Sequence, residues 1–222
     1  MAGRIAPVPG ESAERPFEAD GVRGVLRLPS KPSGEILILA HGAGSNRDAP
    51  LLVRTADSFA AAGWFVLRYD LPFRQQRPKG PPLPAHAVRD RVGIERAAEA
   101  VRGLAPGPVF SGGHSYGGRQ TAMLAAEKPG LFAGLLLLSY PLHPPGKPAQ
   151  KRMAFFPTLR TPALFVHGAD DPFATLEELR EAIGLIPARA ELVAVDGAGH
   201  DLKRGAGLTG EIAARLHRLV AL

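Results

Sequence analysis

Residues 113–117 read Gly-His-Ser-Tyr-Gly, and this stretch decides the fold expected for the chain. An apolar run at 108–110 precedes it, and a run typical of a helix follows at 120–127. Glycines two positions either side of a serine allow a sharp turn, because strand and helix cross there too closely for a Cβ atom. The hydroxyl of Ser115 would then face solvent at the amino end of the helix, where unpaired N–H groups favour a developing negative charge. The stretch therefore predicts an enzyme with a serine nucleophile.

A serine nucleophile needs a base to accept its proton and an acid to orient that base. His200 is the predicted base, because it ends a glycine-rich loop after the last predicted strand. The acid is expected after the preceding strand, where Asp170 and Asp171 stand side by side. Asp171 is preferred, because Pro172 restricts the backbone before it to extended conformations and so presets the carboxylate. Asp170 is the alternative acid, and Asp196 is the next to consider.

Two backbone N–H groups are also needed to stabilise the oxyanion formed during acyl transfer. Tyr116 directly follows the nucleophile and is predicted to supply one of them. The apolar run 35–40 is expected to be a strand leading into His-Gly-Ala-Gly at 41–44. The glycines let this backbone approach a reacting carbonyl, so Ala43 is the predicted second donor. Structural hydrogen bonds are expected of three other histidines, His41, His114 and His167.

The loops that carry these residues resemble the four active-site loops of the α/β-hydrolase superfamily. They read HGAG at 41–44, GGHSYGG at 112–118, HGADDP at 167–172 and GAGH at 197–200. The resemblance covers about residues 20–222 and is greatest to the small, nearly cap-less branch that includes dienelactone-hydrolase-like proteins. It implies Ser115 as nucleophile, Asp171 as acid and His200 as base, without cofactor or metal. Ala43 and Tyr116 are the implied oxyanion donors.

Strands and helices alternate along the chain, which predicts an α/β fold. Strands are expected at 22–28, 35–40, 64–69, 108–112, 135–138, 163–166 and 191–195, and helices at 51–62, 85–104, 116–127, 176–185 and about 210–220. Apolar strands followed by helices favour a mostly parallel central sheet with helices on both faces. The first two strands are expected to form a hairpin across the turn at 29–34. Only about 24 residues separate the strands at 135–138 and 163–166, which predicts a minimal cap or none.

Length and composition favour a single domain. The 222 residues, 45% of them hydrophobic, suit one α/β-hydrolase domain at 21–222 after a flexible lead-in at 1–20. The chain has no cysteine and no apolar stretch of signal-peptide or membrane-helix length, so we expect a cytoplasmic protein without a membrane partner. The 27 basic and 21 acidic residues are interleaved despite the net charge of +6, which argues against a nucleic-acid partner. The expected partner is a small-molecule ester, and the protein is expected to be a monomer or a homodimer.

Three functions remain open from the sequence. The leading one is a carboxylesterase-like serine hydrolase that acts on a small or compact ester. A second is a thioesterase or dienelactone-type hydrolase of anionic substrates, with Arg74, Arg77 or Arg119 binding the carboxylate. A third is a non-catalytic α/β-hydrolase-fold module for binding or scaffolding. The basic loop at 74–79 also fits a solvated surface, and His143 fits either a surface position or a substrate contact.

Overall fold

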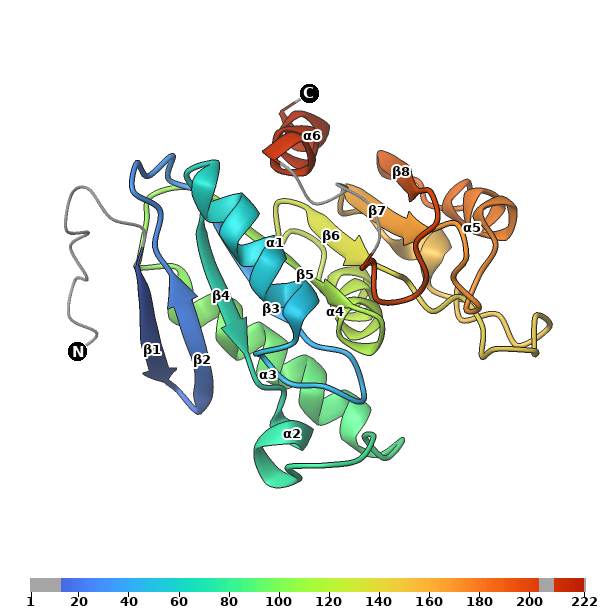
Figure 1. Ribbon diagram of the computed structural model, residues 1–222, viewed down its shortest axis with the longest axis horizontal. Coiled ribbons are helices and arrows are strands. Elements are labelled where there is room, and N and C mark those ends of the chain that lie inside the picture. Colours follow the sequence, from blue (N-terminus) through green and yellow to red (C-terminus); the bar gives the residue numbers. More distant parts are fainter. Residues whose placement is uncertain (1–12, 204–209, 222) are drawn as a thin grey trace.

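The computed structural model describes residues 13–203 and 210–221. Its centre is an eight-stranded sheet with the order β1-β2-β4-β3-β5-β6-β7-β8 (Figure 1). The strands are β1 (Glu14–Ala19), β2 (Val22–Arg27), β3 (Ile36–Ala40), β4 (Phe65–Tyr69), β5 (Val109–His114), β6 (Leu135–Leu138), β7 (Ala163–Gly168) and β8 (Ala190–Val195). The helices are α1 (Pro50–Ala61), α2 (Pro72–Gln76), α3 (His86–Val101), α4 (Tyr116–Glu127), the 3-10 helix η1 (Phe156–Thr158), α5 (Leu176–Ile183) and α6 (Gly210–Val220). The six strands from β4 across to β8 are parallel, as predicted.

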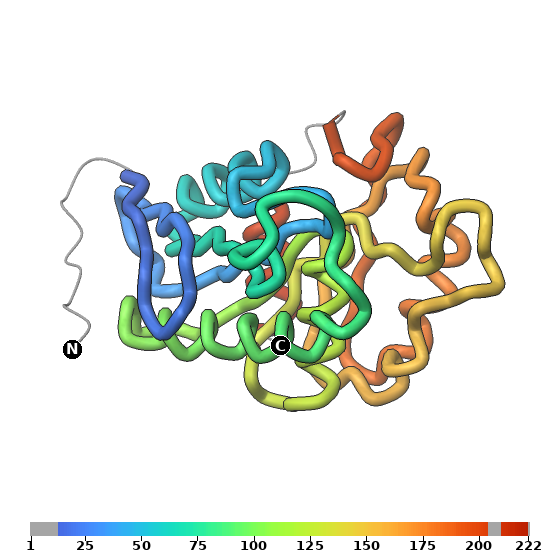
Figure 2. Tube along the Cα trace, turned by 90° about the horizontal axis from the view of Figure 1, so that it is seen from below, coloured from blue at the N-terminus to red at the C-terminus, as the bar shows by residue number. Residues whose placement is uncertain are grey.

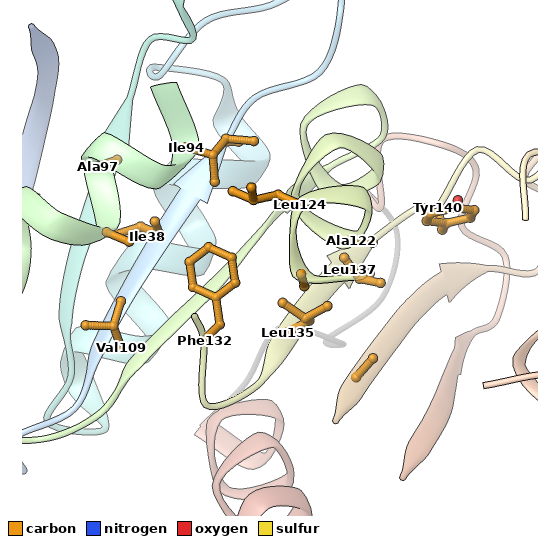
Figure 3. Packing of buried hydrophobic residues seen from close by; sticks show 14 of the residues in the cluster. Ile38, Ile94, Ala97, Val109, Ala122, Leu124, Phe132, Leu135, Leu137 and Tyr140 are labelled. Carbon is orange, nitrogen blue, oxygen red and sulfur yellow. The ribbon is translucent and has the colours of Figure 1, made fainter. Parts of the chain in front are cut away.

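Helices cover both faces of the sheet, which explains why the central strands lack polar alternation. All five residues of β3 and all four of β6 are buried. On one face, Ile94 of α3 and Leu124 of α4 lie over Ile38, Val109 and Leu135 of the sheet (Figure 3). On the other face, α1 and α6 pack with the alternate strand residues, such as Leu37 and Leu136. The parallel strands therefore form a two-sided core, and their carboxyl ends meet at one edge where ligands bind in such folds.

Two expectations at the amino-terminal end are wrong. The strand at 22–28 does not form a hairpin with the next one, because β4 lies between β2 and β3. The hairpin instead joins β1 to β2 through Asp20 and Gly21, whose φ angles are 51° and 77°. Asp-Gly with two positive φ angles is the preferred two-residue connection of a hairpin. The lead-in expected at 1–20 is therefore a strand over Glu14–Ala19, while residues 1–12 lie outside the described part of the chain.

In the described part of the chain, no large cap covers the carboxyl edge of the sheet. The connections at 71–85 and 139–162 are fully described, and they hold only the short helices α2 and η1 (Figure 2). The short helix α2 was not expected, because the prolines in this segment predicted a loop. Among the described residues, no helix has the length and apolar character needed to span a bilayer. The cap-less fold expected from the short segment at 139–162 is confirmed.

The crossing of β5 and α4 over β3 requires glycine. A Cβ atom at Gly117 would lie 2.5 Å from the carbonyl oxygen of His41 and 2.6 Å from that of Ala40. A Cβ atom at Gly113 would likewise overlap the carbonyl of Ala40. These contacts are between backbones and cannot be relieved by a rotamer change, so any side chain here would push β3 and α4 apart.

Replacing Gly117 with alanine is expected to lower the free energy of unfolding by about 1–3 kcal/mol, because the added methyl group overpacks this crossing. Urea denaturation of the two proteins measures the difference. Gly103→Ala is the matched control, since its added Cβ would meet no atom within 4 Å. Its effect should stay within about 0.5 kcal/mol. Equal effects of the two substitutions would contradict the steric account.

Candidate active site

Ser115 lies on the turn between β5 and α4 in a strained conformation. Its φ and ψ are 51° and −113°, a region that costs a non-glycine residue about 1–3 kcal/mol. The N–H of Ser115 donates to the carbonyl of Leu138 at the end of β6 (2.9 Å), and its own carbonyl accepts from Arg119 in α4 (2.9 Å). The neighbouring strand and the following helix thus hold the strained serine in position.

His200 joins Ser115 to Asp171. The loop after β8 brings Nε2 of His200 to 2.9 Å from the Ser115 hydroxyl oxygen, and Nδ1 to 2.8 Å from Oδ2 of Asp171. A carboxylate can only accept, so Nδ1–H donates to Asp171, and Nε2 is free to accept from the serine hydroxyl. Phe173 stacks on the imidazole with ring centroids 4.2 Å apart, which limits rotation of His200. This arrangement can move the serine proton to His200.

Asp171, not Asp170, is the carboxylate that reaches His200. Burial alone would raise the pKa of the Asp171 carboxyl, but the hydrogen bond and charge of His200, with the N–H of Phe173 (2.9 Å), hold this pKa below its ordinary value. Asp171 is therefore ionised at neutral pH. Asp170 is exposed, and its N–H donates to the carbonyl of Ala198. Asp196 is also exposed, and the carboxylate hydrogen-bonded to His200 is that of Asp171.

The loop after β3 places the amide of Ala43 beside Ser115. His41 is fully buried, and its Nδ1–H donates to the carbonyl of Gly42 (2.8 Å), while Nε2 accepts from the N–H of Leu71 (3.1 Å). Burial lowers the pKa of His41, so this neutral tautomer persists. The Gly42 carbonyl is thus pinned on one side of its peptide, and the N–H of Ala43 points the opposite way. No described residue accepts a hydrogen bond from that N–H.

The other histidines make structural hydrogen bonds. His114 donates from Nε2 to the carbonyl of His200 (2.8 Å), and burial lowers its pKa to about 4, so it stays neutral. His167 is bonded to the carbonyl of Ala174 (3.1 Å). His143 is buried rather than at the surface, and its Nε2 lies 3.3 Å from Oε2 of Glu178. His143 does not line the cavity beside Ser115, so neither reading from the sequence holds for it.

Arg74 is a buried structural residue, which corrects its expected place in a solvated or substrate-binding loop. Its guanidinium donates to four backbone carbonyls, those of Ala43 (3.0 Å), Ser45 (2.8 Å), Arg77 (2.9 Å) and Gly80 (2.9 Å). These bonds tie the loop after β3 to the segment that follows α2. With four of its five N–H donors engaged, and outside the cavity lining, Arg74 is unsuited to bind a substrate carboxylate. Arg77 is exposed, as a solvated loop predicts, and lies outside the cavity lining.

A cavity of about 520 Å³ opens beside the serine. Ala43, Ser115 and Tyr116 line one part of it, and Arg119, Arg152 and Phe173 line others. The remaining lining residues are mostly apolar and come from the two connections and from α3 and α4: Pro81, Pro82, Leu83, Pro84, Ala87, Gln120, Met123 and Pro141. Tyr116 is the first residue of α4, so its N–H stands outside the helical hydrogen-bond ladder. Both residues that the sequence nominated as oxyanion donors therefore line the same cavity as the serine.

Sequence reasoning missed a buried carboxyl group that supports this site. Asp90 of α3 is fully buried; its Oδ2 accepts from the Tyr116 hydroxyl (2.7 Å) and its Oδ1 from the N–H of Phe73 (3.0 Å). Burial raises the pKa of Asp90, although these two hydrogen bonds oppose the rise. The signal was present, because Asp90 falls four residues before Ile94 on the apolar face of α3. Arg152 and Phe173 were also missed, and nothing local in the sequence marks them.

Comparison with known proteins agrees with this architecture. A family model described as alpha/beta hydrolase domain matches residues 33–220. A dienelactone hydrolase from Anabaena variabilis is similar with a TM-score of 0.72 at 20% identity, covering 94% of this chain and 97% of that one. Est1E from Butyrivibrio proteoclasticus has a TM-score of 0.71 at 17% identity, covering 95% and 100%. An α/β serine hydrolase without a lid from Xanthomonas campestris has a TM-score of 0.69 at 17% identity, covering 97% and 98%.

Replacing Arg74 with methionine is expected to lower the free energy of unfolding by about 2–4 kcal/mol, because four carbonyls lose a charged donor. Thermal and urea denaturation measure the loss. Arg77→Met is the control, since that exposed side chain makes no hydrogen bond within the described residues, and its effect should stay within about 0.5 kcal/mol. A harmless Arg74→Met would argue against the buried structural role.

Proposed function

Because this chain belongs to the alpha/beta hydrolase domain family, we propose that it is a serine hydrolase that cleaves a compact carboxylic ester. The observation that carries the proposal is the continuous hydrogen-bonded series from Ser115 through His200 to Asp171, opening on the cavity. The strained backbone of Ser115, which is half-buried, costs stability and is therefore unexplained by folding alone. A catalytic role explains why Ser115, His200 and Asp171 are held in hydrogen-bonding contact.

The proposed reaction is acyl transfer through Ser115. The Ser115 oxygen attacks the ester carbonyl carbon while its proton moves to Nε2 of His200. The N–H groups of Ala43 and Tyr116 stabilise the oxyanion of the tetrahedral intermediate. That intermediate collapses with cleavage of the bond to the alcohol oxygen, which takes the proton from His200. Water then attacks the acyl-enzyme carbonyl carbon while His200 accepts its proton. The second tetrahedral intermediate breaks its bond to the Ser115 oxygen, which takes the proton back from His200, and the acid is released.

Asp171 has two roles in this proposal. Its hydrogen bond holds His200 in the tautomer whose Nε2 is unprotonated, and its charge stabilises the imidazolium that forms during attack. The depressed pKa of Asp171 favours the second role, since the carboxylate is ionised throughout the neutral range. Esters suit the proposed chemistry better than amides, because alcohols leave more easily than amines. Thioesters remain compatible with the same chemistry.

Replacing Ser115 with alanine is expected to lower kcat/KM for 4-nitrophenyl acetate and butyrate by at least about a thousandfold, because only oxyanion and binding contributions remain. A fluorophosphonate probe should label the wild-type protein on Ser115 and leave Ser115→Ala unlabelled. Ser58→Ala, on α1, is the control that should retain both labelling and turnover. Absence of labelling in the wild-type protein would favour the non-catalytic binding or scaffold module instead.

Substituting each of the two neighbouring aspartates tests which one is the catalytic acid. Asp171→Asn is expected to lower kcat by roughly a thousandfold or more, because His200 loses both its orienting partner and the charge opposite its cation. Asp170→Asn is expected to cost about tenfold or less, since that side chain is exposed and makes no contact with His200. Steady-state kinetics on one ester measures both. The reverse ranking would assign the acid to Asp170.

A further inference from the structure

Two arginines face the cavity beside Ser115 without an anionic partner. Arg119 lies one helical turn after Ser115 on α4, and Arg152 lies in the connection between β6 and β7. Both line the cavity, which has no Asp or Glu among its lining residues. Within the described residues, neither guanidinium makes a side-chain hydrogen bond or an ion pair, and Nε of Arg119 is buried without a partner. Such groups are costly to bury unless an anion joins them.

The two guanidinium groups also act on each other. Burial lowers the pKa of Arg152, and the positive charge of Arg119 lowers it further. Repulsion between the two positive charges opposes folding. An anion bound between them would relieve this repulsion. The backbone of Arg152 is nevertheless fixed, because its N–H donates to the carbonyl of Leu142 (2.7 Å) and its carbonyl accepts from the Tyr140 hydroxyl (2.6 Å). The pair is therefore positioned by the fold rather than loosely displayed at the surface.

The surroundings of the cavity are positive as well. The connection at 139–162 contains the cations Lys147, Lys151, Arg152 and Arg160 and no Asp or Glu. The segment at 71–89 contains Arg74, Arg77, Lys79 and Arg89 and likewise no acid. The two buried aspartates near the cavity are both engaged: Asp90 accepts from Tyr116 and Phe73, and Asp171 is paired with His200. A small anion would thus meet an attractive field on its way to the cavity.

We infer that Arg119 and Arg152 form a carboxylate-binding subsite, so that the preferred substrates are esters carrying a free carboxylate within reach of the cavity. This inference rests on the proposed serine hydrolase function and adds the substrate class. Guanidinium groups suit a carboxylate because their planar N–H groups donate to both of its oxygens. Pro81, Leu83 and Met123 also line the cavity and suit the short apolar chain that would link the carboxylate to the ester. Arg74 and Arg77 have no part in the subsite.

Matched esters test the subsite on each side of the scissile bond. Mono-4-nitrophenyl adipate carries its carboxylate in the acyl part, and 3-acetoxybenzoate carries it in the alcohol part. Their methyl esters are the neutral partners. For at least one pair, the wild-type ratio of kcat/KM, anionic over neutral, should exceed one. That ratio should fall at least about tenfold in Arg152→Gln and in Arg119→Gln, mainly through KM of the anionic ester, because a charged hydrogen bond to the carboxylate is lost.

Controls separate the subsite from general charge effects. Lys151→Gln and Arg160→Gln remove an exposed cation from the same connection and should leave the ratio within about twofold, since exposed charges are screened at ordinary ionic strength. Arg152→Lys keeps the charge and should lose less of the ratio than Arg152→Gln. If Arg119→Gln fails to fold by its thermal transition, Arg152→Gln decides alone. Equal ratios in wild-type protein and both arginine variants would overturn the subsite while leaving the hydrolase function standing.

Direct binding distinguishes failure of the subsite from failure of the proposed function. Calorimetric titration of adipate into Ser115→Ala should give binding that weakens at least about tenfold in Ser115→Ala/Arg152→Gln. Arginine-dependent binding without turnover of any ester would keep the subsite and overturn the hydrolase. Turnover without arginine-dependent binding or selectivity would keep the hydrolase and overturn the subsite.

Discussion

The contact between the backbones of β3, β5 and α4 is the constraint on which the site depends. At Gly113 and Gly117 the chain passes the carbonyls of Ala40 and His41 at distances that exclude any side chain. This close crossing forces the residue between them, Ser115, into a left-handed conformation that serine adopts only under constraint. It also brings the loop after β3 beside the start of α4. One packing contact therefore brings Ser115, Ala43 and Tyr116 to the same cavity.

The central part of the fold could be predicted because its signals are local. Continuous apolar runs such as Leu135–Leu138 indicate strands buried on both faces, and the alternation with helices indicates a parallel sheet. The order of Ser115, Asp171 and His200 along the chain, each after a strand, was also readable. The preference for Asp171 over Asp170 agrees with the hydrogen bond to His200. Their catalytic roles stay a proposal.

Features that depend on contacts between distant segments could not be predicted. In the sequence, Arg74 is one of several cations in a proline-rich loop. Two of its hydrogen-bond acceptors, the carbonyls of Ala43 and Ser45, lie 31 and 29 residues away and meet it only in the folded chain. Arg152 is marked by no motif, because only the folded chain brings it to the same cavity as Arg119. The misplaced hairpin has a different cause. Asp20-Gly21 is a strong local turn signal, but the residues before it are polar and interrupted by prolines, which is typical of a flexible segment and not of a strand such as β1.

The short connections above the cavity have a consequence for the timing of a catalytic cycle. In hydrolases with mobile lids, opening and closing often set the rate at which substrate enters and product departs. Here the segment after α2 is tied down by Arg74 through the carbonyls of Arg77 and Gly80, and the segment after β6 by the Tyr140 hydroxyl. Under the proposed function, a ligand therefore enters and leaves the cavity without the opening of a large lid in the described part of the chain. Selectivity among ligands would then depend on the shape and charge of the cavity lining, and not on closure of a lid around the bound molecule.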